Sequence, residues 1–123
     1  MSGNVMTDEF EHLKLRLRDF AEERDWDQFH SPKNLSMALI AEAAELLEHF
    51  QWLTEKQSSE LSGDKLVEVG LEIADIQIYL IRIADKLGVD VLEAVEKKIA
   101  LNEAKYPADE VRGSSRKYTE YRK

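Results

Sequence analysis

The sequence predicts an all-α protein, a four-helix bundle completed by homodimerisation, either as a dimer or as a dimer of dimers. Apolar residues recur at intervals of three and four through most of the chain, as on one face of a helix. The two prolines and five glycines mostly stand between these stretches, and no segment shows a convincing strand pattern. A length of 123 residues suits one domain, residues 1–123. The core of such a small domain is thin, and dimerisation would enlarge it.

The first predicted helix runs from about Thr7 to Glu23, and its apolar residues follow helical spacing: Phe10, Leu13, Leu17 and Phe20. An aromatic-rich connection, residues 24–30, leads to the second helix. Ser31 is a typical N-cap residue and Pro32 suits the first helical position. The second helix therefore begins here, and its pattern continues to about Trp52.

A polar loop over residues 54–64 leads to the third helix, from about Asp64 to Leu87, with Gly88 as its predicted C-cap residue. Apolar residues cover most of its circumference, which predicts a buried helix. One narrow stripe interrupts them and contains Glu68, Glu72, Asp75, Tyr79, Arg82 and Lys86. Because carboxylates are rarely buried without partners, we expect a cation beside this stripe.

The fourth predicted helix begins at Asp90, an N-cap residue with Glu93 three positions later, which is the capping-box pattern. It ends near Lys105, before a proline. The remaining polar tail, residues 108–123, is typical of a flexible segment.

Two pairs of carboxylates predict a metal site. On the second helix, Glu42 and Glu45 are one turn apart, as are Glu72 and Asp75 on the third. The loop between these helices favours antiparallel packing, so that the two pairs could face each other across a groove. Carboxylate oxygens with open positions suit Mg²⁺, or Mn²⁺. The alternative from spacing alone is a solvated charged face.

Composition excludes several classes of function. A net charge of −8 argues against binding to a nucleic acid polymer, which needs a basic surface, whereas a divalent cation lets an acidic protein bind a polyphosphate. Without cysteine, no disulfide, thiolate metal site or cysteine nucleophile is possible. No apolar run approaches the roughly 20 residues that span a bilayer, and the N-terminus lacks signal-peptide features. We therefore expect a cytoplasmic protein without a membrane partner.

The four acids, with 26 residues between the pairs, resemble the signature of the MazG-like all-α nucleotide pyrophosphohydrolases. Further segments look like the dCTP pyrophosphatase branch of that family: FAEERDWDQFHSPKNLSMALIAEAAELLEHFQW, EIADIQIYL, NEAKYP and SSRKYTE. The resemblance implies a helical bundle completed by dimerisation, often as a tetramer. It also implies hydrolysis of a nucleoside triphosphate between the α- and β-phosphates, with Glu42, Glu45, Glu72 and Asp75 as magnesium ligands and catalytic residues.

The resemblance also implies a set of substrate-binding residues. Near the base and sugar these are Trp26, His30, Trp52 and Tyr79, and near the phosphates they are Lys98, Asn102, Lys105, Arg116 and Lys117. Each has a structural alternative: the tryptophans also suit a core or an interface, and the lysines a solvated helix face. Leu17 stands where relatives in this branch carry a histidine near the base, which leaves the preferred base open.

Three hypotheses for function follow. The first is Mg²⁺-dependent hydrolysis of dCTP or a modified cytosine nucleotide to the monophosphate and pyrophosphate, which clears unwanted nucleotides. The second is the same reaction on another substrate, such as dUTP, dATP or phosphoribosyl-ATP. The third is a non-catalytic helical module in which the apolar third helix only pairs subunits.

Overall fold

The computed structural model describes residues 2–113, and every regular element in this range is helical. The chain forms two compact units, one up to Val89 and one from Asp90 onward. The first contains α1 (Ser2–Glu23), the 3₁₀ helix η1 (Asp27–Phe29), α2 (Pro32–Glu48), α3 (Glu55–Ser58) and α4 (Gly63–Leu87). The second contains α5 (Val91–Lys105) and α6 (Ala108–Val111). The all-α prediction is confirmed, and no helix among the described residues is long and apolar enough to cross a membrane.

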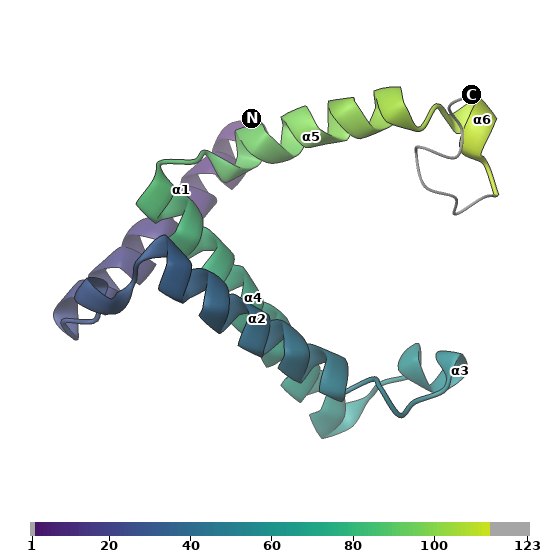
Figure 1. Ribbon diagram of the computed structural model, residues 1–123, viewed down its shortest axis with the longest axis horizontal. Helices are drawn as coiled ribbons and strands as arrows, with labels where there is room; N and C mark the ends of the chain where they lie inside the picture. The colour runs from purple at the N-terminus through teal and green to yellow at the C-terminus, as the bar shows by residue number, and fades with distance from the viewer. Residues whose placement is uncertain (1, 114–123) are drawn as a thin grey trace. The chain divides into compact units, whose positions relative to one another are not determined.

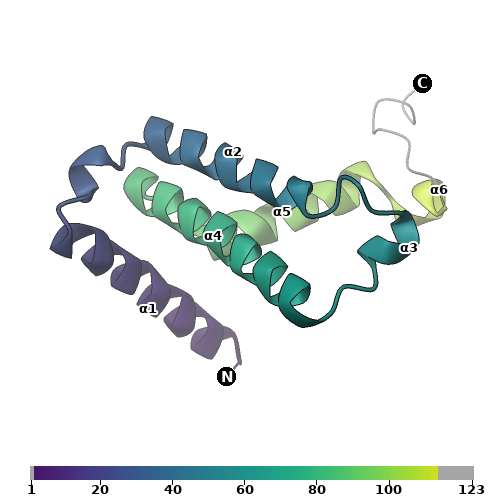
Figure 2. The ribbon, with the colours of Figure 1, turned by 90° about the horizontal axis from the view of Figure 1, so that it is seen from below.

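The first unit is built on α2 and α4, which run antiparallel and side by side (Figure 1), and α1 packs against α4 on another side (Figure 2). Its core is small. The buried apolar side chains are Ala21, Leu35, Val69, Ile81 and Ala84. Two charged side chains, Glu72 and Arg82, are buried with them, and both belong to the polar stripe of α4.

The connection after α1 is fixed by a Schellman motif. Asp25 adopts a left-handed conformation with φ 55°. Its N–H donates to the Glu22 carbonyl at 3.1 Å, and the N–H of Trp26 donates to the Ala21 carbonyl at 2.9 Å. The Gln28 amide donates to the Asp25 carbonyl at 2.9 Å. These local bonds turn the chain sharply and bring Trp26 back against the end of α1.

The second helix begins where the sequence predicts, since the Ser31 side chain accepts a hydrogen bond from the Asn34 N–H at 3.1 Å. The predicted end near Trp52 is wrong, because α2 ends at Glu48. Tight turns follow, and Thr54 then starts the short helix α3 within the predicted loop. Thr54 and Gln57 form a reciprocal capping box there, a pattern readable in the sequence.

The helix α4 starts and ends close to its predicted bounds, and Gly88 is its left-handed C-cap with φ 68°. The prediction that α4 is buried holds for one side only. Leu66, Val67, Leu71 and Ile73 remain more than half exposed, because α1 and α2, the main packing partners of this helix, cover only part of it.

In the second unit, the Asp90 side chain accepts a hydrogen bond from the Glu93 N–H at 3.0 Å, as its N-cap position predicts. The helix α5 ends at Lys105 as predicted. The short α6 lies within the segment predicted to be a flexible tail, and the rest of that segment, residues 114–123, lies outside the described residues.

Candidate functional site

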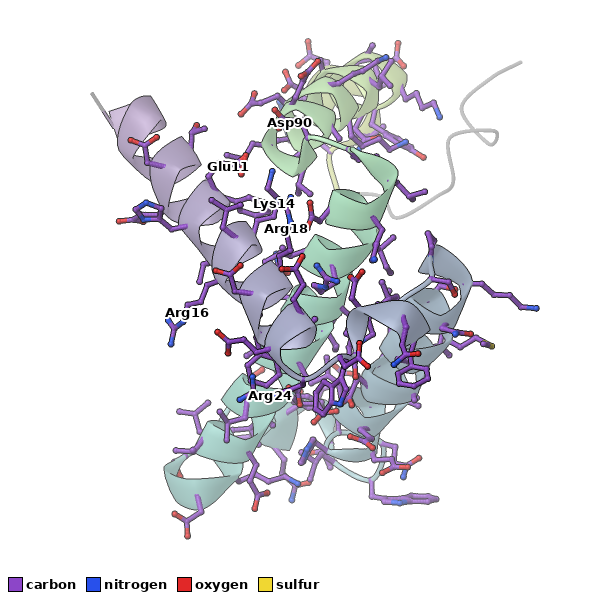
Figure 3. All side chains as sticks on the ribbon, turned by 90° about the vertical axis from the view of Figure 1, so that its left-hand side faces the viewer. Glu11, Lys14, Arg16, Arg18, Arg24 and Asp90 are labelled. Atoms are coloured by element: carbon purple, nitrogen blue, oxygen red, sulfur yellow. The ribbon has the colours of Figure 1, made fainter. Side chains whose placement is uncertain are left out.

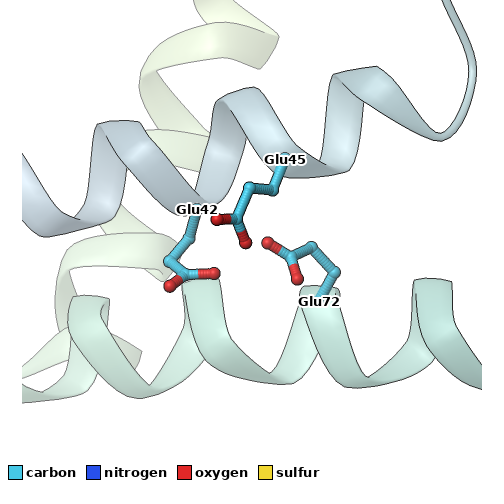
Figure 4. Close-up of side chains that lie close together, drawn as sticks. All are labelled: Glu42, Glu45 and Glu72. Atoms are coloured by element: carbon cyan, nitrogen blue, oxygen red, sulfur yellow. The ribbon is translucent and has the colours of Figure 1, made fainter.

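Three of the four predicted ligands converge between α2 and α4. Glu42 and Glu45 extend from α2 toward Glu72 of α4 (Figure 4), and one carboxylate oxygen of each lies within 4.8 Å of those of the other two. The spacing of three residues places Glu42 and Glu45 on one face of α2. Antiparallel packing then sets Glu72 opposite them. Glu72 is 9% exposed, Glu42 is half-buried and Glu45 is exposed.

The cluster is electrostatically unfavourable by itself. The neighbouring Glu42 carboxylate, then burial and the Glu45 carboxylate, raise the pKa of Glu72 to about 7. Ionised carboxylates only accept hydrogen bonds, so these groups can share one only if one of them is protonated. Among the described side chains, Glu42 Oε2 and Glu72 Oε1 are buried without a hydrogen-bond partner. The cluster therefore needs either a proton or a cation.

The donor set fits a hard divalent cation. All three groups offer carboxylate oxygen, and no thiolate or imidazole is among them. Oxygen donors of this kind suit Mg²⁺ or Mn²⁺ and not a soft metal. Two buried, unpartnered oxygens are the acceptors that a cation would occupy. Glu42, Glu45 and Glu72 are thus the residues that could hold it.

Asp75 lies one turn beyond Glu72 on α4 but is not part of this three-carboxylate cluster. Its side chain is one methylene shorter, and it lines the neighbouring cleft together with Glu42. Tyr79, one further turn along, lines the same cleft. Burial, and then the charges of Glu42 and Asp75, raise the pKa of the Tyr79 phenol. The phenol therefore keeps its proton and can donate a hydrogen bond.

This cleft has a volume of about 370 Å³, within the range of small-molecule sites. Residues from α1, α2, α4 and the connection line it: Leu17, Phe20, Ala21, Trp26, His30, Glu42, Asp75, Ile78, Tyr79 and Arg82. It has an aromatic wall in which the Trp26 and Phe20 rings meet edge to face, with centroids 5.7 Å apart. The Arg24 guanidinium covers the Phe20 ring at 3.6 Å. One end of the cleft is therefore apolar and aromatic, and the other is acidic.

Of the predicted base-binding residues, Trp26, His30 and Tyr79 line the cleft. Trp52 does not: it lies in the turns after α2 and is 87% exposed. The reason is the early end of α2, which takes Trp52 off the stripe of Glu42 and Glu45.

The predicted phosphate-binding residues lie elsewhere in the chain. Lys98, Asn102 and Lys105 share one exposed face of α5 in the second unit, and their role stays a prediction. Arg116 and Lys117 lie outside the described residues.

Sequence reasoning missed four cleft residues: Phe20, Ala21, Ile78 and Arg82. Phe20 was read only as part of the apolar face of α1, although it belongs to the aromatic wall. Arg82 was seen on the stripe of α4 without a role. The position of Arg82 one turn beyond Tyr79, on the same stripe, was the sequence feature that could have indicated that it lines the cleft.

The geometry can be compared with known proteins. The chain matches the model of the MazG-like family over residues 38–121, which is more than half of its length. The chain belongs to the MazG-like family. The family that the resemblance of the sequence motifs implied is thereby confirmed.

Relatives of this MazG-like chain include human dCTP pyrophosphatase 1, which is 44% identical over 112 residues. The mouse protein of the same name is 40% identical over 112 residues. Each match covers 89% of this chain and 66% of the relative, so the chain spans just under two thirds of the length of these curated relatives. A solved pyrophosphatase from Archaeoglobus fulgidus has 42% identity and a TM-score of 0.75, covering 79% of this chain and 91% of that one.

Proposed function

We propose that this chain is a Mg²⁺-dependent pyrophosphohydrolase that cuts nucleoside triphosphates between the α- and β-phosphates, with dCTP or a modified cytosine nucleotide as substrate. One observation carries the proposal: three converging carboxylates, two with buried unpartnered oxygens, stand beside a cleft with an aromatic wall. The relatives named dCTP pyrophosphatase support the reaction and the base. Clearance of unwanted nucleotides is the proposed physiological role.

Different residues along the cleft contact different parts of the bound nucleotide in this proposal. The flat face of Trp26 stacks on the base, and Tyr79 donates a hydrogen bond to the bound nucleotide. Glu42, Glu45, Glu72 and Asp75 would hold the cation. When bound, Mg²⁺ neutralises phosphate charge and lowers the pKa of a coordinated water.

The proposed reaction balances with water as its only co-reactant. The water oxygen bonds to the α-phosphorus, and the bond from that phosphorus to the bridging oxygen breaks. A carboxylate oxygen of the site accepts the water proton, and pyrophosphate leaves. In this scheme Lys98, Asn102, Lys105, Arg116 and Lys117 contribute positive charge or hydrogen bonds to the phosphates.

Base preference depends on the apolar end of the cleft. Leu17 lies there, beside the aromatic wall, and offers neither a donor nor an acceptor to a base edge. His30 is the imidazole among the residues that line the cleft. The name of the relatives supports cytosine nucleotides as the first candidates, with dUTP, dATP and phosphoribosyl-ATP as the alternatives to be tried.

We also propose that the active form is a homodimer or a homotetramer in the cytoplasm. The exposed apolar residues of α4 support this, and so does an apolar groove of about 460 Å³ along α1 and α4, lined by Leu13, Arg16, Leu17, Phe20, Ala74, Gln77, Ile78 and Ile81. Soluble chains rarely leave such surfaces uncovered. Light scattering at micromolar concentration should give at least twice the chain mass, and a monomer would contradict the proposal.

The test of activity is a panel of nucleotides incubated with and without Mg²⁺, with products resolved by chromatography. We expect monophosphate and pyrophosphate, only with the metal and fastest with a cytosine nucleotide. In ¹⁸O-labelled water, the label should enter the monophosphate. Glu42→Gln and Asp75→Asn should abolish turnover without unfolding the chain, whereas the exposed Glu60→Gln should retain it.

The outcomes separate the hypotheses. Diphosphate plus phosphate would show that the wrong bond had been assigned. Full activity in Glu42→Gln or Asp75→Asn would remove that residue from the site. If no nucleotide is hydrolysed, the non-catalytic pairing module becomes the better account.

A further inference from the structure

A charged network outside the carboxylate cluster joins α1 and α4, which line the cleft, to η1, which lies between the cleft residues Trp26 and His30. Arg82 of α4 is 3% exposed; its Nη2 donates to Asp27 Oδ1 at 3.0 Å and its Nη1 to Asp85 Oδ2 at 3.2 Å. Asp85 also accepts two hydrogen bonds from Arg18, which extends from α1 toward α4 (Figure 3). Lys86 Nζ lies 2.6 Å from Asp27 Oδ1. Charge-assisted bonds thus connect α1, η1 and α4.

Stability alone does not account for this arrangement. Buried ion pairs often contribute little net stability, because desolvation offsets their attraction. Arg82 Nε is buried without a partner among the described residues. An apolar side chain at this position of α4 would fill the same space without this unpartnered group. What the guanidinium adds is a link to η1, across 55 residues of sequence. That link reaches the connection between α1 and α2, which supplies Trp26 and His30 to the cleft.

The same guanidinium faces the His30 ring. Arg82 Nη2 lies 3.5 Å from His30 Nδ1. Because a guanidinium only donates, Nδ1 must act as the acceptor and the ring proton must sit on Nε2. Burial, and then the charges of Arg82 and Lys86, lower the pKa of His30, while Asp27 opposes them. Both effects favour the neutral His30 ring with Nε2–H as its donor.

We propose that Arg82 is a positioning residue of the cleft: it holds residues 25–30 against α4, so that Trp26 and His30 face the substrate with Nε2–H of His30 as the donor. The inference rests on the proposed nucleotide hydrolysis and concerns how the base end is held, not how the phosphate is cut. Arg82 itself acts through Trp26 and His30.

The test compares Arg82→Gln with Arg18→Gln, a matched change at the α1 end of the network. A second variant, Asp27→Ala, removes the link from the η1 side, keeps the buried pair between Arg82 and Asp85, and changes a side chain that is 43% exposed. For each we would measure the melting temperature, hydrogen exchange of residues 25–30, and kcat and KM with Mg²⁺. The His30 ring would be titrated by long-range ¹H–¹⁵N spectra.

We expect Arg82→Gln and Asp27→Ala to speed exchange in residues 25–30 and to raise KM about tenfold with a smaller change in kcat, as when a positioned stacking contact is weakened. Arg82→Gln should also raise the His30 titration midpoint and mix its tautomers. Arg18→Gln should lower the melting temperature without these effects.

Unchanged exchange of residues 25–30 in both variants, or an unchanged His30 ring in Arg82→Gln, would overturn the proposal. So would effects equal to those of Arg18→Gln at an equal loss of melting temperature. Exchange and titration need no substrate, so they test the positioning role even if hydrolysis is not found. If Arg82→Gln does not fold, exchange and KM in Asp27→Ala decide.

Discussion

Removing the negative charge of Glu72 should change stability in opposite directions with and without a divalent cation. Without metal, Glu72 ionises only against two neighbouring carboxylates, and its pKa is raised from 4.5 to about 7. The folded chain then binds an extra proton between these two values, so this contribution to stability is complete below pH 4.5 and is lost as the pH rises through 7. The Glu72→Gln variant cannot ionise there. We expect it to melt higher than the wild-type protein at pH 8 and similarly at pH 5.

With metal, the order should reverse. A cation present at 100 times its dissociation constant stabilises the fold by about 2.7 kcal/mol. At about 2.1 cal/mol/K per residue, 123 residues give an unfolding entropy of ~0.26 kcal/mol/K. The wild-type melting temperature should therefore rise by about 10 °C. Glu72→Gln should lose most of this shift, because it replaces one of three carboxylates within 4.8 Å by a neutral amide.

The assay is thermal unfolding at pH 5 and pH 8, with Mg²⁺ titrated against a chelator. Glu60→Gln, an exposed acid of the same unit, is the control for the loss of one negative charge. Taking the difference between variant and wild type cancels the titration of all groups that they share. A full metal-induced shift in Glu72→Gln, or a metal-free variant that is less stable at pH 8, would refute the assignment of this cluster as a cation site.

Three further results are expected. Trp26→Ala should raise KM about 10- to 100-fold with little change in kcat, since base stacking contributes about 1–3 kcal/mol; an unchanged KM in steady-state kinetics would contradict this. Gly88→Ala should lower the melting temperature by about 4–8 °C, because φ 68° costs a non-glycine residue about 1–2 kcal/mol and a Cβ there meets nothing within 4 Å. The hydrogen bond from Arg18 holds the pKa of Asp85 below its usual 3.8. The stability that Asp85 contributes is thus present above pH 3.8 and lost as the pH falls through the lower folded value. Asp85→Asn should therefore reduce the melting temperature at pH 6 more than at pH 2.

The ends of the helices were largely predictable because they depend on local chemistry. Ser31, Gly88 and Asp90 mark boundaries through bonds to residues within a turn or two. The late end assigned to α2 shows the limit of this reasoning. The apolar pattern continues past Glu48, but the capping box at Thr54 requires the chain to leave the helix first.

The residues that come together in the candidate site were predictable only in part. Periodicity places Glu42 with Glu45 on one stripe and Glu72 with Asp75 on another, and this was enough to predict an acidic groove. It does not fix the rotation of α2 against α4. That rotation places Glu72 within reach of both residues of α2 and leaves Asp75 in the neighbouring cleft.

The sequence by itself determined the all-α class, most helix boundaries, the MazG-like family and the two acidic pairs, because these depend on the order and spacing of residues. Tertiary structure alone decided that Trp26 and Phe20 form one wall of the cleft and that Arg82 is buried against Asp27. The physical reason is that these contacts depend on how separate helices pack. A charged side chain whose position in the sequence suggests a solvent-exposed helix face can then be buried and link two helices.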